Sequence, residues 1–332
     1  MTRVVDVLNP ATDAQFDAIR TAPRTSAAHR TLLADLDCMN SVQVGGHGMS
    51  APLPAAPCII AWNVERCLFP EETAAQVAAH GADVVLLSEV DCGMARTKQR
   101  HTTADMAEAL GMHYAFGVEF LELGLGSPTE LEFCKDDHNA RGWHGNAILS
   151  RAPLNKVGMV RLDDHGHWYC PEFGADPGQP RVGGRMALLA EVMTDAGPLC
   201  VVSTHLESNS GAAHREEQFK LLLDEIDRFA EHMPVVIGGD LNTGNHMPPE
   251  YDWRDESLFA LAEQRGYSWD GTPDGMTTRP SLITRHPDRQ MKLDWFATRG
   301  VIAAESRLIP SDETGTVLSD HDAVLCQVHR AE

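Results

Sequence analysis

Short apolar runs recur along the chain from residue 58 onward. Each is four to nine residues long, is rich in Val, Ile and Leu, and is bounded by Gly, Pro, Asp or Asn. Runs of this length and composition favour buried β-strands. We therefore predict strands in CIIAWNV, ADVVLLSEV, HYAFGVEF, GNAILS, RMALLAEVM, PLCVVSTHL, MPVVIGGDL, LDWFAT and AVLCQVH.

Fewer segments show the spacing of a helix. TTADMAEALG offers a threonine as N-cap and Gly111 as its end. Two more helices are predicted near the N-terminus, in ATDAQFDAIR and in SAAHRTLLADLD. A longer helix is predicted from about residue 214 to residue 232, where apolar side chains recur at helical spacing, namely Phe219, Leu222, Leu223, Ile226 and Phe229. Many strands with few long helices predict an α/β protein of two packed sheets with helices outside.

The first 55 residues differ from the rest of the chain. Their two predicted helices are followed by the irregular segment VQVGGHGMSAPLPAAP. We predict a partly helical N-terminal extension over residues 1–55 and one main domain over residues 56–330. Three roles are compatible with the extension: packing over a sheet edge, making a dimer contact, or screening a pocket.

Composition and charge narrow the class of partner. The 332 residues are 43% hydrophobic and carry a formal net charge of -21. Because non-specific nucleic-acid binding draws on Lys and Arg at the phosphates, this charge disfavours a broad basic face for DNA. A small or lipid-like substrate, or one held through a metal, is favoured. The oligomeric state is left open.

Two further sequence features concern location and cysteine chemistry. The chain has no apolar run long enough for a transmembrane helix, and its N-terminus carries charges where a signal peptide needs an unbroken apolar stretch. We therefore predict a cytoplasmic protein. The eight cysteines form no C-x-x-C pair, which favours structural thiols.

Polar side chains gather at the carboxyl ends of the predicted strands. In GGDLNT, Asp240 and Asn242 are two residues apart, so on an extended strand they point the same way. A lone acid at a strand end is usually a turn residue, but the feature recurs at several strand ends. The full set is Asn63, Glu89, His205, Asp240, Asn242, Asp294, Asp320 and His321. An oxygen-rich set without thiols is typical of a Mg²⁺ site.

Together these motifs resemble the endonuclease/exonuclease/phosphatase superfamily with the deoxyribonuclease I-like fold. The resemblance rests on WNVE, LLSEVD, HGNAILSR, STHLE, GGDLN, LDWF and SDHDAV, which occur in the family's order between about residues 58 and 328. It implies a four-layer α/β/β/α sandwich of two mixed β-sheets and metal-assisted hydrolysis of a phosphoester. It covers none of the first 55 residues.

The resemblance also implies a metal site. Glu89 would be the principal ligand, with Asn63 beside it and Asp320 completing the site, and the ion would be Mg²⁺ or Mn²⁺. The metal would polarise a phosphoryl oxygen and offset charge on the leaving oxygen.

Five catalytic roles follow from the same resemblance. Asp240 would orient or deprotonate the attacking water, and Asn242 would hold the phosphate or that water. Asp294 would fix the tautomer of His321 and favour its protonated form. His321 would then donate to the phosphoryl oxygen, and His205 would stabilise the phosphate or protonate the leaving group.

Three residues are candidates for contact with the substrate. Arg96 lies in the basic segment ARTKQRH, which precedes a predicted helix, a place where phosphates can bind. Arg185 opens a predicted strand behind two glycines, and Asn146 lies in HGNAILSR. For Arg96 a solvated loop position is equally compatible with the sequence.

Two inserted loops are predicted to shape the pocket. One is LDDHGHWYCPEFGADPGQPRVGG, residues 162–184, and the other is TGNHMPPEYDWRDES, which follows the Asp-x-Asn motif. Their aromatic residues can contact a substrate or form the loops' own small cores. His165 and His167 in HGH are zinc-ligand types, but a zinc site needs three or four ligands and the sequence shows no clear partners. We predict solvated loop residues there.

Three function classes follow. The leading hypothesis is a Mg²⁺- or Mn²⁺-dependent phosphodiesterase or phosphomonoesterase acting on a small-molecule or lipid-like phosphoester. The alternative is an endonuclease or exonuclease acting on DNA or RNA, which needs a local basic stripe that the net charge disfavours. A catalytically dead binding module on the same fold is disfavoured because each motif residue keeps a chemically competent side chain.

Overall fold

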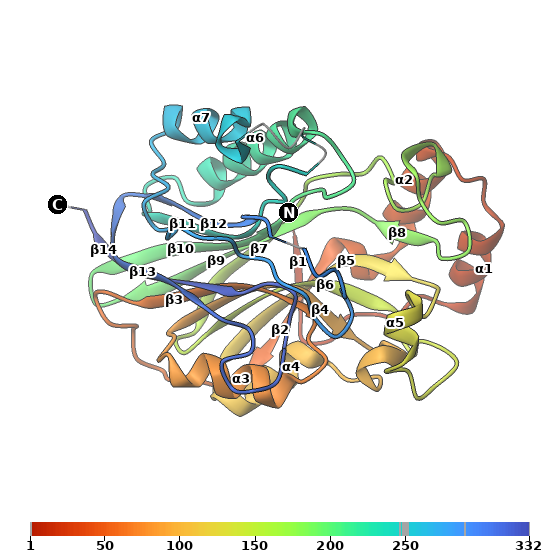
Figure 1. The fold of residues 1–332 in the computed structure, drawn as a ribbon, viewed down its shortest axis with the longest axis horizontal. Coiled ribbons are helices and arrows are strands. Elements are labelled where there is room, and N and C mark those ends of the chain that lie inside the picture. The colour runs from red at the N-terminus through yellow and green to blue at the C-terminus, as the bar shows by residue number, and fades with distance from the viewer. Residues whose placement is uncertain (1, 246, 248–251, 289, 332) are drawn as a thin grey trace.

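Two mixed β-sheets packed face to face form the centre of the molecule (Figure 1). The computed structural model describes residues 2–245, 247, 252–288 and 290–331. Within these residues the larger sheet has nine strands: β1 (Arg3–Val5), β2 (Ser41–Gly46), β5 (His113–Glu122), β6 (Trp143–Ser150), β4 (Val84–Cys92), β3 (Cys58–Arg66), β14 (Ala323–Arg330) and β13 (Val301–Ile309) in spatial order, with β8 (Arg181–Gly183) paired to β5. The smaller has five: β12 (Asp294–Arg299), β11 (Val235–Asp240), β10 (Gly197–His205), β9 (Met186–Thr194) and β7 (Leu154–Arg161).

Parallel pairs in both sheets place the sequence motifs at one end of the sandwich. β3 pairs in parallel with β4, and β10 pairs in parallel with β11. The carboxyl ends of each pair therefore lie side by side. β12 runs antiparallel to β11, and its first residue, Asp294, is the register partner of Asp240.

Alternation along the strands divides the apolar side chains among three layers. Along β3, Ile59 and Ala61 belong to the core between the sheets, whereas Ile60 belongs to the core on the outer face of the larger sheet. Along β10, Val201 faces the inter-sheet core and Val202 the core beneath the helices of the smaller sheet. A period of two on both sheets requires helices on both outer faces. The predicted four-layer α/β/β/α sandwich is confirmed.

Helices cover the two outer faces (Figure 1). α3 (Pro70–Ala79) and α4 (Thr102–Leu110) lie on the larger sheet, and α6 (Ala212–Phe229) and α7 (Ser257–Gln264) lie on the smaller one. The predicted helices correspond to α4, α6, α1 (Asp13–Thr21) and α2 (Ser26–Asp35). α4 ends at Gly111 as predicted, but its N-cap is His101, whose ring nitrogen accepts from Ala104 N. The short α5 (Pro128–Leu131) and the 3₁₀ turns η1 (Asp37–Asn40), η2 (Ala95–Thr97), η3 (Pro171–Phe173) and η4 (Trp253–Asp255) complete the elements described.

Residues 1–55 take part in the larger sheet. β2 pairs antiparallel with β5, and β1 extends the sheet beyond β2. Ile19 of α1 and Leu33 of α2 belong to the same buried cluster as Trp62. The sheet and one core therefore run across the predicted boundary at residue 55, so these residues fit the predicted role of packing at a sheet edge.

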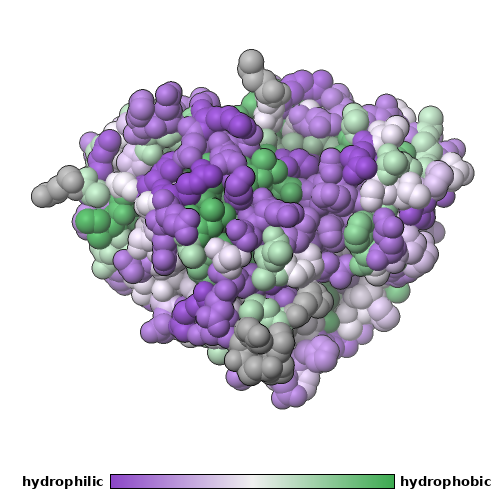
Figure 2. All heavy atoms as spheres, turned by 90° about the horizontal axis from the view of Figure 1, so that it is seen from above, coloured by the Kyte–Doolittle hydropathy of each residue, from purple (hydrophilic) through white to green (hydrophobic). Residues whose placement is uncertain are grey.

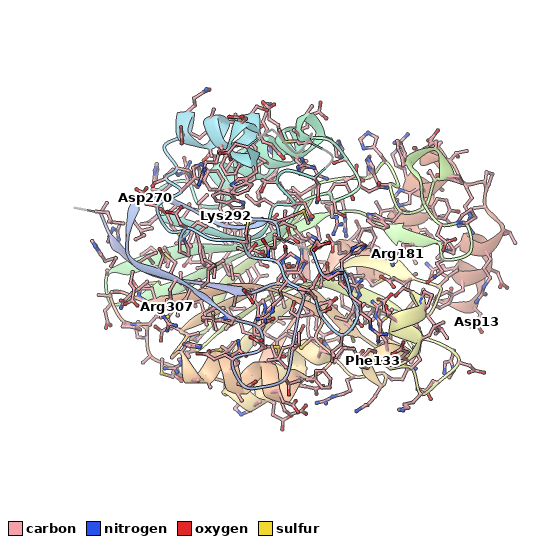
Figure 3. All side chains as sticks on the ribbon, in the orientation of Figure 1. Asp13, Phe133, Arg181, Asp270, Lys292 and Arg307 are labelled. Carbon is pink, nitrogen blue, oxygen red and sulfur yellow. The ribbon has the colours of Figure 1, made fainter. Side chains whose placement is uncertain are left out.

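Side chains fill the space between the sheets (Figure 3). The face that carries α6 and α7 is largely hydrophilic with scattered apolar areas (Figure 2). All eight cysteines are free thiols. No helix within the described residues is long and apolar enough to cross a bilayer.

The sheets approach closely at the strand that delivers Asp240. A Cβ added at Gly238 would lie 2.7 Å from Phe296 Cε1, 2.8 Å from Leu86 Cδ1 and 2.9 Å from Ala61 Cβ. We expect Gly238→Ala to lower the free energy of unfolding by about 1–3 kcal/mol, because the extra methyl overpacks the inter-sheet core. Urea denaturation measures this change.

Gly178→Ala is the matched control. Its nearest obstacle is the side chain of the exposed Asp176, which can move. We expect a change within about 0.5 kcal/mol there. Equal effects of the two substitutions would contradict the close approach inferred at Gly238.

Candidate active site

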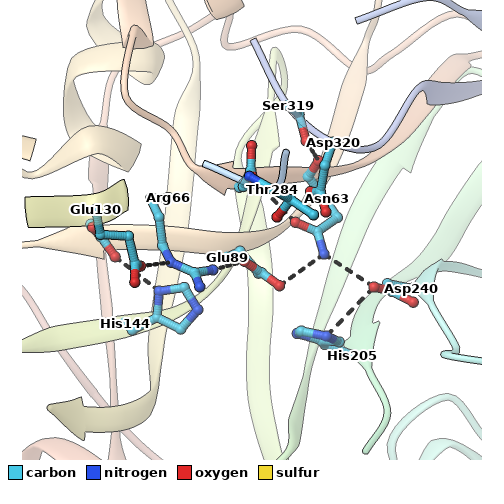
Figure 4. A network of polar contacts seen from close by, with 12 residues as sticks. Asn63, Arg66, Glu89, Glu130, His144, His205, Asp240, Thr284, Ser319 and Asp320 are labelled. Carbon is cyan, nitrogen blue, oxygen red and sulfur yellow. Dashed lines mark hydrogen bonds and ion pairs between the residues drawn. The ribbon is translucent and has the colours of Figure 1, made fainter. Parts of the chain in front are cut away.

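A polar pocket of about 310 Å³ lies where strand ends of the two sheets meet. β3, β4 and the turn before β14 contribute from the larger sheet, and β10 and β11 contribute from the smaller one (Figure 4). The described lining residues are Glu65, Arg66, Glu89, His205, Ser208, Asp240, Asn242, Asn245, Thr284, Met291, Asp320 and His321. Predicted residues more than a hundred positions apart in sequence are thus brought together.

The amide of Asn63 links the two sheets at the pocket. Its Nδ2 donates to Glu89 Oε1 at 3.0 Å and to Asp240 Oδ2 at 3.1 Å. Its Oδ1 accepts from the backbone N of Glu65 at 3.1 Å, and its backbone carbonyl accepts from Ser319 Oγ. Asn63 is therefore held from four sides, and it fixes the separation between Glu89 and Asp240 (Figure 4).

Two imidazoles face the carboxylate of Asp240. His205 Nε2 lies 3.6 Å and His321 Nε2 3.7 Å from Asp240 Oδ2. Burial alone would raise the pKa of Asp240, but the charges of His321 and His205 outweigh it and lower that pKa. Asp240 is therefore an ionised hydrogen-bond acceptor near neutral pH.

His321 and Asp294 form a buried pair at the floor of the pocket. His321 Nδ1 lies 2.8 Å from Asp294 Oδ2, and both side chains are at most 2% exposed. Burial would lower the pKa of His321, but the carboxylates of Asp294, Asp320 and Asp240 together raise it to about 10. The imidazole is thus held as a cation with Nε2 directed toward Asp240.

His205 is supported from behind by a buried ionic group. Arg185 Nη1 lies 2.8 Å from His205 Nδ1 and 3.2 Å from Glu119 Oε1, and Arg185 Nε donates to Glu207 Oε2 at 3.3 Å. Burial would raise the pKa of Glu119, but Arg185 and His205 outweigh it and lower the pKa to about 2. Arg185 thus lies behind the pocket and contacts His205, which lines it.

Strained backbone concentrates at the pocket. Among the described residues, seven other than glycine have positive φ, and four of them line the pocket: Glu65, Arg66, Glu89 and Asn242. Glu89, with φ of 61°, lies where the β3–β4 and β4–β6 registers shift. Left-handed conformations cost free energy and persist where surrounding contacts impose them, commonly at functional sites.

The donor set fits a hard divalent cation. Glu65, Glu89 and Asp320 present carboxylates to one pocket, and the neighbouring Asn63 adds a side-chain oxygen that accepts from Glu65 N. Burial and, after it, the neighbouring Asp320 raise the pKa of Glu65 to about 7, so a cation beside these two carboxylates would be favoured. Oxygen donors and surplus negative charge suit Mg²⁺ or Mn²⁺. Asp240, Asp294 and His321 form a second group whose donor atoms lie within 4.8 Å of one another.

Sequence reasoning missed several residues of the site. Glu65 follows Asn63 by two positions on β3, so strand alternation could have identified it. Arg66 contacts Glu89 through Nη1 and donates to Glu130 through Nε at 2.8 Å. Glu119 occupies the middle of an apolar strand, and only the tertiary structure places it beside His205.

Two of the three proposed substrate contacts, Arg96 and Asn146, are not among the residues described as lining the pocket. The side chain of Arg96 is fully buried, and it contacts Asp91 Oδ2 at 2.7 Å and Glu122 Oε2 at 2.9 Å. Arg96 therefore does not contact the substrate as predicted, because a guanidinium enclosed by carboxylates has no face left for a phosphate. Asn146 is fully buried on β6, opposite the β4 segment that holds Glu89, and donates to Met186 O at 3.0 Å; it is not among the described lining residues.

The aromatic residues of loop 162–184 pack against the protein. Trp168 lies edge to face with Phe120, Tyr169 is buried in the core, and Phe173 stacks on His167. These aromatic residues form local cores, which is one of the two alternatives given above; the other was contact with the substrate. In the second loop, residue 246 and residues 248–251 lie outside the described residues, and Asn245 lines the pocket.

Comparison with known proteins identifies the family. The Endonuclease/Exonuclease/phosphatase family matches residues 60–321. The chain belongs to this family. Its sequence is also 25% identical over 188 residues to a protein of Escherichia coli (strain K12) named "Uncharacterized protein YbhP", a match over 57% of this chain and 64%, less than two thirds, of that relative.

Solved structures show the same fold. An endonuclease/exonuclease/phosphatase from Beutenbergia cavernae aligns with a TM-score of 0.60 at 20% identity, over 83% of this chain and 72% of that one. The human Nocturnin catalytic domain with bound sulfate aligns with a TM-score of 0.56 at 16% identity, over 85% and 97%. D. rerio TDP2 complexed with single-strand DNA product aligns with a TM-score of 0.55 at 17% identity, over 82% and 99%.

The burial of Arg96 leads to a stability prediction. We expect Arg96→Met to lower the free energy of unfolding by about 3–5 kcal/mol, because it leaves buried carboxylates without a counter-charge. Arg96→Lys keeps the charge and should lower the free energy of unfolding by a smaller amount. It can be measured if the methionine variant does not fold. Urea denaturation provides the measurement.

Arg100→Met is the matched control from the same basic segment. Arg100 is partly exposed and pairs with Glu71 and Asp105 at the surface. Its loss should cost no more than about 1 kcal/mol. Equal costs at positions 96 and 100 would contradict the buried network.

The same network predicts a dependence of stability on pH. Burial would raise the pKa of Glu122, but Arg181 and Arg96 outweigh it and lower the pKa from 4.5 to about 2. A depressed pKa contributes stability that is present above about 4.5 and is lost as the pH falls through about 2. We expect the urea midpoint to fall between pH 5 and pH 3. In Glu122→Gln this slope should be smaller, and an unchanged slope would contradict the assignment.

Proposed function

We propose that the protein is a divalent-metal-dependent phosphoester hydrolase that acts on a small-molecule or lipid-like phosphoester by attack of water. The observation that carries the proposal is the convergence of carboxylates, amides and imidazoles from both sheets on one pocket. Membership of the family supports the reaction class.

Asp240 is the residue that receives the water. Its Oδ2 accepts from Asn63 at 3.1 Å, and its Oδ1 accepts from the backbone N of Asn242 at 2.9 Å. With its lowered pKa it is ionised, so it orients a water through a hydrogen bond and accepts a proton as the bond to phosphorus forms.

Asn242 holds the neighbouring oxygen. Its Nδ2 donates to Leu206 O at 3.0 Å, and its Oδ1 accepts from Asn245 at 2.8 Å. An amide nitrogen has two hydrogens, so one stays available for a phosphoryl oxygen or the water. The positive φ of Asn242 turns this side chain toward the pocket wall that carries Asp240.

The two histidines balance charge that develops on the phosphoryl group. His321, kept protonated by Asp294, directs Nε2 into the pocket as a donor. His205, next to Arg185, faces the same carboxylate from the other sheet. Fixed donors of this kind stabilise a transition state because they need no reorientation during the reaction.

Asn63, Glu89 and Asp320 would hold Mg²⁺ or Mn²⁺, with Glu65 adjacent. When bound, the ion supplies Lewis-acid polarisation of the phosphoryl oxygen and offsets charge on the leaving oxygen. Arg66, which contacts both Glu89 and Glu130, fixes the orientation of the Glu89 carboxylate.

The lining of the pocket favours a small substrate over nucleic acid. The only basic side chain among the described lining residues, counting Lys and Arg, is that of Arg66. It is already paired with the carboxylates of Glu89 and Glu130. A polyanionic strand needs several cations along its path. The DNA product bound by D. rerio TDP2 belongs to that protein and makes nuclease activity the second candidate to test.

The test is hydrolysis of bis-p-nitrophenyl phosphate and p-nitrophenyl phosphate with Mg²⁺, Mn²⁺ or chelator. We expect a metal-dependent rate that falls by roughly 100-fold or more in Glu89→Ala and Asp240→Asn, because each removes a fixed charge from the reacting centre. The preferred ester then distinguishes a diesterase from a monoesterase.

Asp137→Asn serves as the matched control, since its side chain is fully exposed and lies outside the pocket. It should keep the wild-type rate. A labelled single-stranded oligonucleotide completes the panel. Cleavage of the oligonucleotide with no hydrolysis of either nitrophenyl ester would favour the nuclease, and metal-independent rates on all substrates would overturn the proposal.

A further inference from the structure

A second cluster of potential metal ligands lies outside the active-site pocket, where loop 162–184 meets α6. Asp163, His167 and His214 each present one ligand atom, and these atoms all lie within 4.8 Å of one another. His214 is the third residue of α6, and the other two belong to the loop. The sequence showed the HGH motif, and the fold supplies the partners that the motif lacked.

The carboxylate of Asp163 is at the centre of this cluster. Oδ2 lies 3.1 Å from His167 Nδ1, and Oδ1 lies 3.6 Å from His214 Nε2. The Asp163 side chain is fully buried. A third imidazole, His165, places Nδ1 2.6 Å from Oδ1 and is half exposed.

One potential ligand atom of the cluster, His214 Nε2, has no hydrogen-bond partner. His214 Nε2 is buried without a hydrogen bond and faces Asp163 from beyond hydrogen-bond distance. A buried polar atom that forms no hydrogen bond costs free energy, so each one requires an explanation. A ligand between Asp163, His167 and His214 would satisfy it.

The spacing suits a tetrahedral metal. Ligand atoms about 2.0–2.1 Å from Zn²⁺ lie roughly 3.3 Å apart in a tetrahedron. The separations from His167 Nδ1 to Asp163 Oδ2 and from His214 Nε2 to Asp163 Oδ1, 3.1 and 3.6 Å, are close to that value. The rings of His167 and His214 are tilted by 38° to each other with centroids 4.7 Å apart, so small ring rotations would bring both nitrogens to one ion.

The surroundings also favour a cation. Glu207 and Asp164 add negative charge near the imidazoles, and Arg185 and Arg30, which pairs with Asp164, are nearby positive groups. Glu217, three residues after His214 on the exposed side of α6, places Oε2 3.8 Å from His214 Nδ1. Phe173 stacks on His167 with centroids 4.5 Å apart and gives the site an apolar wall.

We propose that Asp163, His167 and His214 bind Zn²⁺ or a similar transition-metal ion at a site separate from the catalytic one, with His165 or water as the fourth ligand. Two or three imidazoles with one carboxylate select Zn²⁺ over Mg²⁺, which prefers oxygen ligands. The oxygen-rich catalytic pocket has the opposite preference.

The site would fasten loop 162–184 to α6 next to the catalytic machinery. Trp168, one residue after His167, donates Nε1 to Glu207 at 3.1 Å, and Glu207 in turn accepts from Arg185 behind His205. The ion therefore stabilises the fold and positions the residues that support His205.

Metal binding by the full chain tests the inference without any substrate. The protein is stripped with chelator and titrated with Zn²⁺ or Co²⁺ while Mg²⁺ is kept in excess to occupy the carboxylate pocket. We expect one equivalent of Zn²⁺, the visible absorption of tetrahedral Co²⁺, and a higher unfolding temperature with Zn²⁺. His167→Ala and His214→Ala should each weaken binding by at least roughly tenfold.

His138→Ala is the matched control, because His138 also lies beside an aspartate, Asp137, but on an exposed loop. It should bind Zn²⁺ as the wild type does. His214→Gln serves if the alanine variant does not fold. Absence of Zn²⁺ binding by the wild type, or equal binding by the wild type and both histidine variants, overturns the proposal whatever the hydrolase assays show.

Discussion

The contact between Asn63 and Asp240 is the interaction on which the active site depends. Asn63 lies near the end of β3 in one sheet and Asp240 ends β11 in the other, and a hydrogen bond of 3.1 Å joins them. This bond is possible only if the sheets are held close, which the missing side chain of Gly238 permits. Packing in the sheet interior therefore sets the distance between the proposed metal ligand Glu89 and Asp240, the proposed acceptor of the water proton.

Two groups of charged residues surround that contact, one lining the pocket and one buried behind it. The pocket itself is rich in carboxylates and suits a divalent ion, with the His321 cation on its floor. Behind it, Arg185 and Arg96 are enclosed by buried acids and position His205 and the strand that carries Glu89. Buried ion pairs of this kind contribute little net stability, but removing one partner is costly, so they fix geometry more than they raise stability.

The zinc site that we infer adds a second group of potential ligands, in loop 162–184 and α6. Imidazole ligands and oxygen ligands occupy separate places, so two different ions can bind without competing. The loop connects to the catalytic residues through Glu207, which accepts from both Trp168 and Arg185.

Much of the fold and the site followed from the sequence, for a local reason. Apolar runs with a period of two require two-sided burial, and the polar residues that end them must leave the core at a strand end, so the sheets and the residues Asn63, Glu89, Asp240 and His321 were predictable. The settings of Arg96, Glu119 and His214 were not, because their partners Glu122, His205 and Asp163 lie 26, 86 and 51 positions away. The sequence shows the same residue whether its charge faces solvent or a buried counter-charge. The tertiary structure alone decided which charges are enclosed, because burial is set by the packing of segments that are distant in sequence.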